Sequence, residues 1–224
     1  PITISGGVTL NGGSVDSLGD LRLDAALTSN VTLNANSTIG SFGNGSIIGN
    51  ITGSFTITKV ASAATSTILL SGNNTYNGIT INGGILQPGS AAALGAISGT
   101  VTVASGATLD LNGQTITNTN PLTISGTGSG NGALINTSAT GATYAGPITL
   151  GALTNIGGST SSGTITLSGT TLNNAGFGLK LDGGAGGSIS NVISGSNNLI
   201  AQGGTWTLSG ANTYTGATTI SGGT

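Results

Sequence analysis

Five aspartates are the only acidic side chains in this chain, so any acid–base or metal chemistry would have to start from them. Asp16, Asp20 and Asp24 cluster around Arg22. Such a cluster fits either a calcium site or a solvated charged face of a strand. Calcium takes six or more oxygen ligands at defined positions, whereas residue alternation places Asp20, Arg22 and Asp24 on one face of a strand. We therefore predict the charged face.

The rest of the chain offers little equipment for catalysis. Glutamate, histidine and cysteine are absent, so a serine nucleophile would lack its usual histidine base. The glycine run at 183–187, after Asp182, is faintly similar to a glycine-rich calcium repeat but lacks the repeating aspartate. We predict no enzyme activity and no catalytic, cofactor-binding or metal-binding residue.

All three tyrosines occur in the same short motif, Thr-Tyr-x-Gly. They are Tyr76, Tyr144 and Tyr214, and the steps between them are 68 and 70 residues. A fixed period of this kind is the mark of a repeat architecture. Each ring could stack on a sugar or cover a neighbouring repeat, and we favour the second because tyrosine commonly buries an apolar ring and bonds through its hydroxyl. Trp206 is predicted to lie in the core or at a corner.

The composition describes an ordered, nearly uncharged chain. Charged residues are 4% and hydrophobic residues 36% of the 224, and glycine alone accounts for 43. Disorder usually combines low hydrophobicity with high charge, which is the opposite balance. Nucleic-acid binding needs a basic stripe, and the only basic residues are Arg22, Lys59 and Lys180. No apolar run approaches the ~18 residues of a membrane-spanning helix.

The apolar pattern alternates with a period of two, which predicts short strands with one buried face. Helix-forming residues are scarce, since glutamate is missing and lysine is rare. The segments that share the alternation are 2–4, 8–10, 21–23, 31–33, 79–81, 101–103, 109–111, 122–124, 148–150 and 179–181.

Many short strands fit either an antiparallel sandwich or a parallel solenoid, and their spacing favours the solenoid. Ile79, Val101 and Leu122 begin similar strands at intervals of 22 and then 21 residues. We predict an all-β fold, a right-handed parallel β-helix (β-solenoid) of about ten coils and roughly 50 Å. Threonines on the outer face should form hydrogen-bonded ladders, and asparagines in the turns should stack. An ice-binding surface would need regular Thr-x-Thr rows, which the irregular coil lengths disfavour.

We treat 1–224 as a single β-solenoid segment with Tyr-x-Gly repeats near 70–86, 142–150 and 208–224. The sequence shows no signal peptide and no cap at either end, although solenoids need capping coils. We therefore expect a segment of a longer chain, or ends that dock on further copies.

The outer two repeats resemble the autotransporter-associated β-strand repeat, also called the passenger-associated transport repeat. Its usual form is Leu-x-Gly-x-Asn-Thr-Tyr-x-Gly followed by a Thr/Ile strand and Gly-x-Leu. The first copy matches it at Leu70, Gly72, Asn74, Thr75, Tyr76, Gly78, Thr80, Gly84 and Leu86. The second matches it at Leu208, Gly210, Asn212, Thr213, Tyr214, Gly216, Thr218, Ile220 and Gly223. The copy around Tyr144 is degenerate.

This resemblance implies a β-helix of an autotransporter-like passenger, extracellular or on a bacterial cell surface. It implies no particular activity, since such proteins act mostly as stalks, adhesins or large surface proteins. We expect a structural segment of a surface fibre, and as an alternative an adhesin passenger that binds host or glycan surfaces. The expected partners are copies of itself or further coils, end to end, with no nucleic acid, no cofactor and no membrane insertion of this segment.

Overall fold

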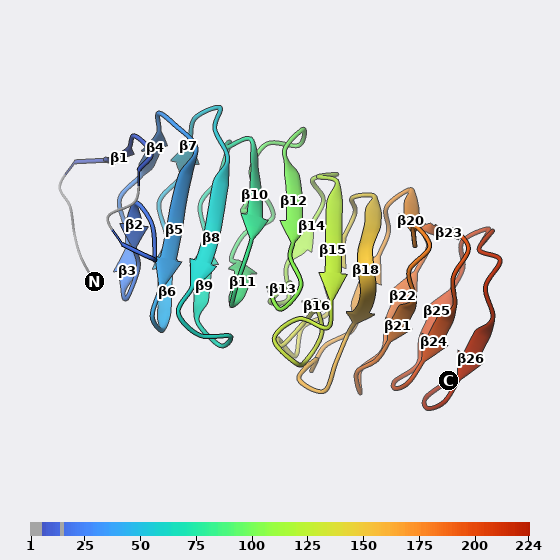
Figure 1. Cartoon of the computed structure of the whole chain (residues 1–224). Helices are drawn as coiled ribbons and strands as arrows, with labels where there is room; N and C mark the ends of the chain where they lie inside the picture. The colour runs from blue at the N-terminus through green and yellow to red at the C-terminus, as the bar shows by residue number, and fades with distance from the viewer. Residues whose placement is uncertain (1–5, 14–15) are drawn as a thin grey trace.

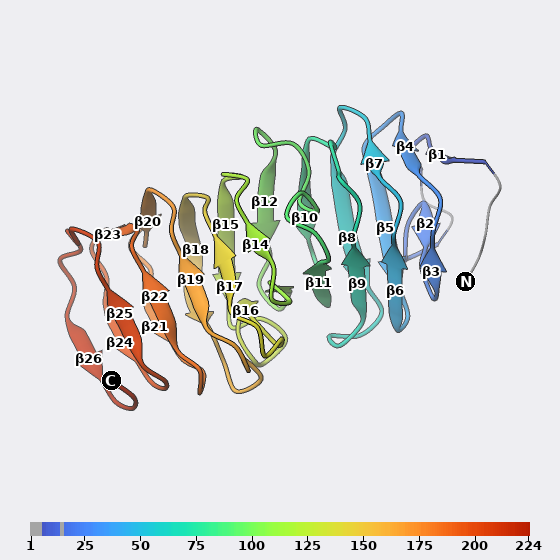
Figure 2. The same ribbon diagram turned by 180° about the vertical axis from the view of Figure 1, so that it is seen from behind.

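The computed structural model describes residues 6–13 and 16–224, and within them the regular elements are all β-strands. The strands wind into a β-solenoid of about ten coils. The first and last strands lie at opposite ends of an elongated body (Figure 1), and the view from behind shows the same progression (Figure 2). In the described part of the chain, no helix is long and apolar enough to cross a membrane.

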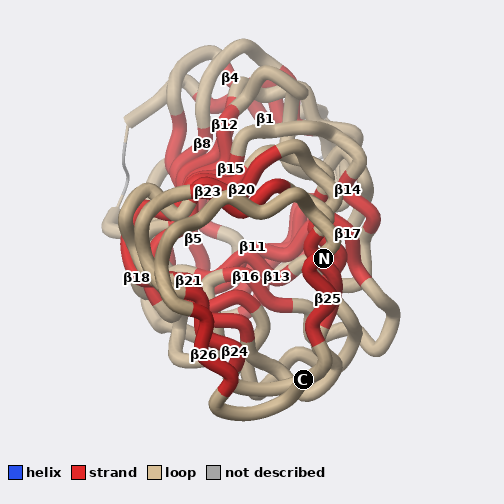
Figure 3. Tube along the Cα trace, turned by 90° about the vertical axis from the view of Figure 1, so that its right-hand side faces the viewer, coloured by secondary structure: helices blue, strands red, loops and turns tan. Residues whose placement is uncertain are grey.

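The named strands pair in parallel throughout, as a solenoid requires. Ile79 lies opposite Val101, and Val101 lies opposite Leu122, so the intervals seen in the sequence are the register of the coils. Viewed along the long axis, β20 lies with β23 and β24 with β26 (Figure 3). The predicted fold class is thus confirmed, while the hand of the coil stays a prediction.

Each coil contributes up to three strands, and strands in the same position along the coil stack into a face. The first face comprises β2 (Leu21–Arg22), β5 (Ser37–Ser41), β8 (Ile57–Ala61), β10 (Gly78–Ile81), β12 (Thr100–Val103), β15 (Leu122–Gly126), the start of β18 (Ile148–Ile156), β20 (Thr171–Asn173) and β23 (Val192–Ser194).

The second face follows the first in every coil. It comprises β3 (Ala26–Leu27), β6 (Asn44–Ile47), β9 (Thr67–Leu70), β11 (Ile85–Pro88), β13 (Thr108–Asp110), β16 (Leu134–Ile135), the end of β18, β21 (Leu179–Leu181), β24 (Leu199–Ala201) and β26 (Thr218–Ile220). Since β18 runs through both faces, the two form one continuous sheet.

The third face is interrupted midway. Its strands are β1 (Val8–Leu10), β4 (Val31–Leu33) and β7 (Ile51–Thr52) in one sheet, then β14 (Thr115–Ile116), β17 (Ala142–Tyr144), β19 (Ile165–Leu167), β22 (Gly187–Ile189) and β25 (Trp206–Leu208) in another. Irregular backbone fills the gap: Thr75 N donates to Ile51 O, and Ala96 N donates to Tyr76 O. The first repeat occupies this interruption.

The strand predictions agree closely with the structure. All predicted segments from 8–10 to 179–181 overlap strands, although the one at 109–111 is displaced by one residue, to Thr108–Asp110. The predicted segment at 2–4 lies outside the described residues. Some strands outside the predicted segments are interrupted by serine, glycine or asparagine, such as Asn44–Ile47, and others are only two residues long, such as Leu134–Ile135.

A continuous aliphatic row runs through the interior of the first face. The row consists of Ile57, Ile79, Val101, Leu122, Ile148, Leu172 and Ile193, and each residue is 1% exposed or less. Burying one such side chain contributes about 1.5–3 kcal/mol. Stability therefore accumulates coil by coil, as expected of a solenoid.

Threonines form the matching outer row of the first face. Thr38, Thr58, Thr80, Thr102, Thr123 and Thr149 follow one another in register. The prediction that such threonines hydrogen-bond to one another is wrong for this row, because no bond joins their hydroxyls. Hydroxyls of successive coils do bond elsewhere, as Ser188 does to Thr166 at 3.4 Å and Thr205 with Thr224 at 3.0 Å. The row is also single, without the second row of a Thr-x-Thr surface.

Asparagines at the corners do link the coils. Asn34 Nδ2 donates to Asn11 Oδ1 at 3.1 Å, which is the predicted amide stacking. More often the side-chain oxygen accepts a main-chain N–H of the next coil, as Asn30 Oδ1 does from Asn50 N and Asn50 Oδ1 does from Asn73 N, both at 2.9 Å. An asparagine can therefore continue the inter-coil ladder where the strand ends.

Candidate functional site

The aspartate cluster of the first coil is used to hold the second coil. Asp20 Oδ2 accepts Thr38 N at 2.8 Å, and Asp24 Oδ1 accepts Phe42 N at 3.0 Å. The Phe42 N–H bond is the main cause that lowers the pKa of Asp24, with Arg22 adding to it. The Arg22 guanidinium lies 4.2 Å from the centroid of the Phe42 ring.

The predicted charged face is present, and its carboxylates bond to backbone rather than to one another. Arg22 and Asp24 are exposed and form an ion pair, while Leu23 is 3% exposed and points into the core. Over residues 6–13 and 16–224, no group of three or more His, Cys, Asp or Glu side chains is placed to hold a metal ion.

Asp110 is the one aspartate that is fully buried, at 1% exposure. It accepts hydrogen bonds from Gln87 Nε2 at 2.8 Å, from the N–H of Asn112 and Thr137 at 3.0 Å, and from the Thr137 hydroxyl. These donors come from both neighbouring coils. Through Gln87 and Thr137 this carboxylate ties its own coil to the coil before and the coil after.

Two of the three tyrosines are buried joints between coils. Tyr76 and Tyr144 are 0% exposed. Tyr76 Oη donates to Ala93 O in the following coil at 2.9 Å, and Tyr144 Oη donates to Asn120 O in the preceding coil at 2.7 Å. Burial raises the pKa of both phenols. Neither ring can stack on a sugar from solvent.

The Asn-Thr pair before Tyr76 clamps the isoleucine of the coil below. Asn74 Oδ1 accepts Ile51 N at 2.8 Å, and Thr75 N donates to Ile51 O at 2.9 Å. Asn74 Nδ2 then donates to Ala93 O in the coil above at 2.8 Å. One 4%-exposed amide therefore joins three successive coils where the third face has no strand.

The second outer motif makes the same clamp. Asn212 Oδ1 accepts Ile193 N at 2.9 Å, and Thr213 N donates to Ile193 O at 2.9 Å. A Gly-Gly pair again comes after the following strand, and its second glycine has a left-handed φ in both copies, 63° at Gly84 and 74° at Gly223. Two stretches that are similar in sequence thus fold alike in detail. We call this arrangement the repeat joint, meaning Asn74, Thr75 and Tyr76 or Asn212, Thr213 and Tyr214.

A family model described as passenger-associated-transport-repeat matches residues 65–87 and 201–224. The chain carries two passenger-associated transport repeats. No curated protein and no solved structure matches the chain. The degenerate copy around Tyr144 lies outside the matched residues. Its tyrosine differs in structure as well, since Tyr144 lies within strand β17 and bonds backwards rather than forwards.

The two passenger-associated transport repeats lie at different positions around the solenoid. The first clamps Ile51 on the third face and leads into β10 on the first face. The second clamps Ile193 on the first face and leads into β26 on the second face. The repeat is therefore displaced by one face. It encodes a local joint between coils and not a fixed place on the surface.

Lys59 is a buried lysine for which the sequence analysis predicted no role. It occupies an inward position between Ile39 and Ile81 in an otherwise aliphatic row and is 0% exposed. Its Nζ donates to Ser66 O at 3.1 Å and to Gly83 O. Burial lowers the pKa of Lys59 to about 7. The signal was in the sequence, because Ile57-Thr58-Lys59 places the lysine at an inward position.

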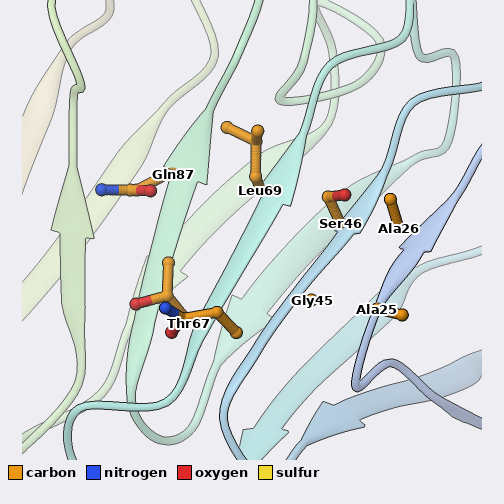
Figure 4. A pocket seen from close by; sticks show the side chains of 8 residues that line it. Ala25, Ala26, Gly45, Ser46, Thr67, Leu69 and Gln87 are labelled. Carbon is orange, nitrogen blue, oxygen red and sulfur yellow. The ribbon is translucent and has the colours of Figure 1, made fainter. Parts of the chain in front are cut away.

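A shallow groove of about 380 Å³ lies on the outer second face of the first four coils. Figure 4 shows Ser46, Leu69 and Gln87 on adjacent strands along it. Its lining consists of Ala25, Ala26, Asn44, Gly45, Ser46, Thr67, Leu69 and Gln87. The lining contains amide and hydroxyl groups but no aromatic ring and no charge. Trp206, at 9% exposure, packs in the core as predicted.

Proposed function

We propose that this chain is a non-catalytic, extracellular structural segment of a bacterial cell-surface fibre. The observation that carries the proposal is that the aspartates and tyrosines are used to join coils. Asp20, Asp24, Asp110 and the buried Tyr76 and Tyr144 all bond to neighbouring coils. The transport repeats likewise serve as joints, and their family supports a secreted or cell-surface location. Coils joined in this way form a rigid rod.

An adhesin passenger is the second candidate, and the groove on the second face favours it. Its amide and hydroxyl groups, from Asn44, Thr67 and Gln87, are the kind that bind sugar hydroxyls. Saturable binding of the purified chain to a glycan array, abolished by Thr67→Lys in the groove but not by Thr149→Lys on the first face, would support this candidate. We expect no saturable binding, because the groove is shallow and lacks an aromatic platform.

Resistance to trypsin tests the structural role. Trypsin cleaves after lysine and arginine, and the chain has only three such residues. One of them, Lys59 in strand β8, is 0% exposed. We expect the folded chain to be cut at most after exposed Arg22, because Lys180 lies within strand β21, which is paired on both edges. The chain unfolded in urea and then diluted into trypsin is cut at all three sites. Mass spectrometry of the fragments reads out the sites. Rapid cleavage after Lys59 under native conditions would contradict a persistent rod.

A further inference from the structure

Hydroxyl side chains form a regular row on the outer side of the third face. The row crosses strands β14, β17, β19, β22 and β25, which follow one another along the body (Figure 2), and consists of Thr115, Thr143, Thr166, Ser188 and Thr207. Each member lies in register with the next, so successive positions are about 4.8 Å apart. The adjacent side chains of Ile116, Ile165 and Ile189 are buried in the core. The row therefore points outward.

A second hydroxyl row runs beside the first, two residues further along the chain. Its positions are Thr117, Ala145, Ser168, Ser190 and Ser209, of which only Ala145 lacks a hydroxyl. Main-chain bonds continue the same register past the strand ends, as when Ser168 N donates to Tyr144 O. The two rows are about 6.6 Å apart, since a parallel strand rises about 3.3 Å per residue. Together they form a two-dimensional grid of hydroxyls.

Unequal coil lengths do not disturb this grid. The long coil from Thr115 to Thr143 carries extra residues in the loop between β15 and β16, where the register shifts between Ile124 and Gly126. The strands of the third face stay paired residue by residue from β14 to β25. The objection that irregular coil lengths raise against a Thr-x-Thr surface therefore does not hold for this face.

The grid is uncharged and presents its hydroxyls to solvent. Over residues 6–13 and 16–224, the hydroxyls of Thr143, Thr164 and Thr207 bond to no other residue, while Ser188 donates to Thr166 at 3.4 Å. Segments 115–117, 143–145, 164–168, 188–190 and 205–209 contain no charged residue. Charged groups such as an ammonium are strongly hydrated and would interrupt an ordered water layer. This face has no such interruption.

A shallow hollow of about 360 Å³ lies within the same face. Its lining consists of Thr164, Thr166, Ala185, Gly187, Ser188 and Thr205. Hydroxyls predominate, and they can both donate and accept hydrogen bonds. A hollow with several polar partners has room for ordered waters. The lining contains no aromatic ring on which a sugar could stack.

We propose that the outer third face from β14 to β25 binds the surface of ice crystals. Hydroxyls repeating at about 4.8 Å along the solenoid and about 6.6 Å along the strands are comparable in spacing with the oxygen atoms on a face of hexagonal ice. Waters held by such a grid can join the crystal lattice. The outer first face lacks this property, because its threonine row is single. This activity goes beyond the structural role and does not depend on it.

Microscopy of ice growth in solutions of the purified chain tests the proposal. We expect the wild-type chain to slow the growth and recrystallisation of ice, and Thr166→Lys to lose most of that effect, because its ammonium projects from the centre of the grid. Thr149→Lys is the matched control and should keep the full effect. Both threonines lie in outer rows on strands that are paired on both edges. A wild-type chain without effect on ice overturns the proposal, as does equal activity of the two variants.

Ala145→Thr tests the second row, because it supplies the hydroxyl that this row lacks between Thr117 and Ser168. We expect this variant to slow ice growth more than the wild type does. A variant no more active than the wild type contradicts the role of the second row. Binding to powdered cellulose that Thr166→Lys abolishes, with no effect on ice, overturns the ligand and favours a polysaccharide. Surface fibres in native material, together with a chain inert toward ice, refute this proposal and leave the structural function standing.

Discussion

Replacing Lys59 with methionine is expected to stabilise the chain by about 2–3 kcal/mol at pH 7. A pKa held at about 7 by burial, against 10.5 ordinarily, means that the fold makes protonation of Lys59 unfavourable by roughly 4–5 kcal/mol. Methionine removes this penalty and suits the aliphatic row between Ile39 and Ile81. Part of the gain is lost, because Gly83 O loses its donor at a cost of about 1–3 kcal/mol. Ser66 O keeps a bond from Ile85 N.

The pH dependence gives this prediction its clearest signature. Between about pH 7 and pH 10.5 the unfolded chain holds a proton on Lys59 that the folded chain does not. The free energy of unfolding of the wild type therefore rises by about 1.4 kcal/mol per pH unit over that window, and Lys59 adds no pH dependence below it. Lys59→Met should show no such rise, so the two proteins should become similar in stability near pH 9.

Urea denaturation at pH 6, 7, 8 and 9 measures both effects. Lys180→Met is the control, because Lys180 lies on the outer side of β21 in register with Asn155 and Ile200. This change should alter stability by no more than about 0.5 kcal/mol at any of these pH values. If Lys59→Met proves less stable than the wild type at pH 7, the lysine is a stabilising staple and our assignment of its energetics is wrong.

Asn74→Ala is expected to destabilise the chain by about 2–5 kcal/mol. The amide satisfies two buried main-chain groups, Ile51 N below it and Ala93 O above it. Ala93 O keeps the Tyr76 hydroxyl, but Ile51 N loses its acceptor, and a small cavity forms at a site that is 4% exposed. Hydrogen exchange should show the Ile51 amide losing protection.

Asn212→Ala removes the same clamp from the last coil and serves as the comparison. Its amide is partly exposed, and only Ile193 N depends on it. Because water can replace the lost acceptor there, we expect a cost below about 1 kcal/mol and faster exchange limited to the last coil. Equal effects of the two substitutions would mean that the joint between three coils contributes nothing beyond a surface hydrogen bond.

The coil register could be read from the sequence because its determinants are local. Alternation in 79–81, 101–103 and 122–124 fixes which side chains point inward, and the intervals between these segments fix the pairing. Charge placement was equally predictable, since Leu21 and Leu23 leave Arg22 only the outer side of the strand.

The roles of Asn74 and Lys59 could not be predicted in the same way. Asn74 bonds to the N–H of Ile51 and the carbonyl of Ala93, which lie 23 and 19 residues away in sequence. No local pattern around Asn74 indicates these partners. Alternation from Ile57 does place Lys59 inward, but a lysine there contradicts the binary pattern, and its carbonyl partners on Ser66 and Gly83 cannot be read from the local sequence. The threonine row shows the opposite error, because its in-register placement was correct but no hydrogen bond joins its hydroxyls, whereas Ser188 and Thr166 do share one.

Electron microscopy of native material from the source cells tests the structural role most directly, with antibodies against this chain marking its position. We expect uniform filaments, with label repeating along them, because parallel coils that share one continuous core build an elongated rigid body. Short discrete rods that carry label at one place and bind a ligand would contradict the account and favour the adhesin.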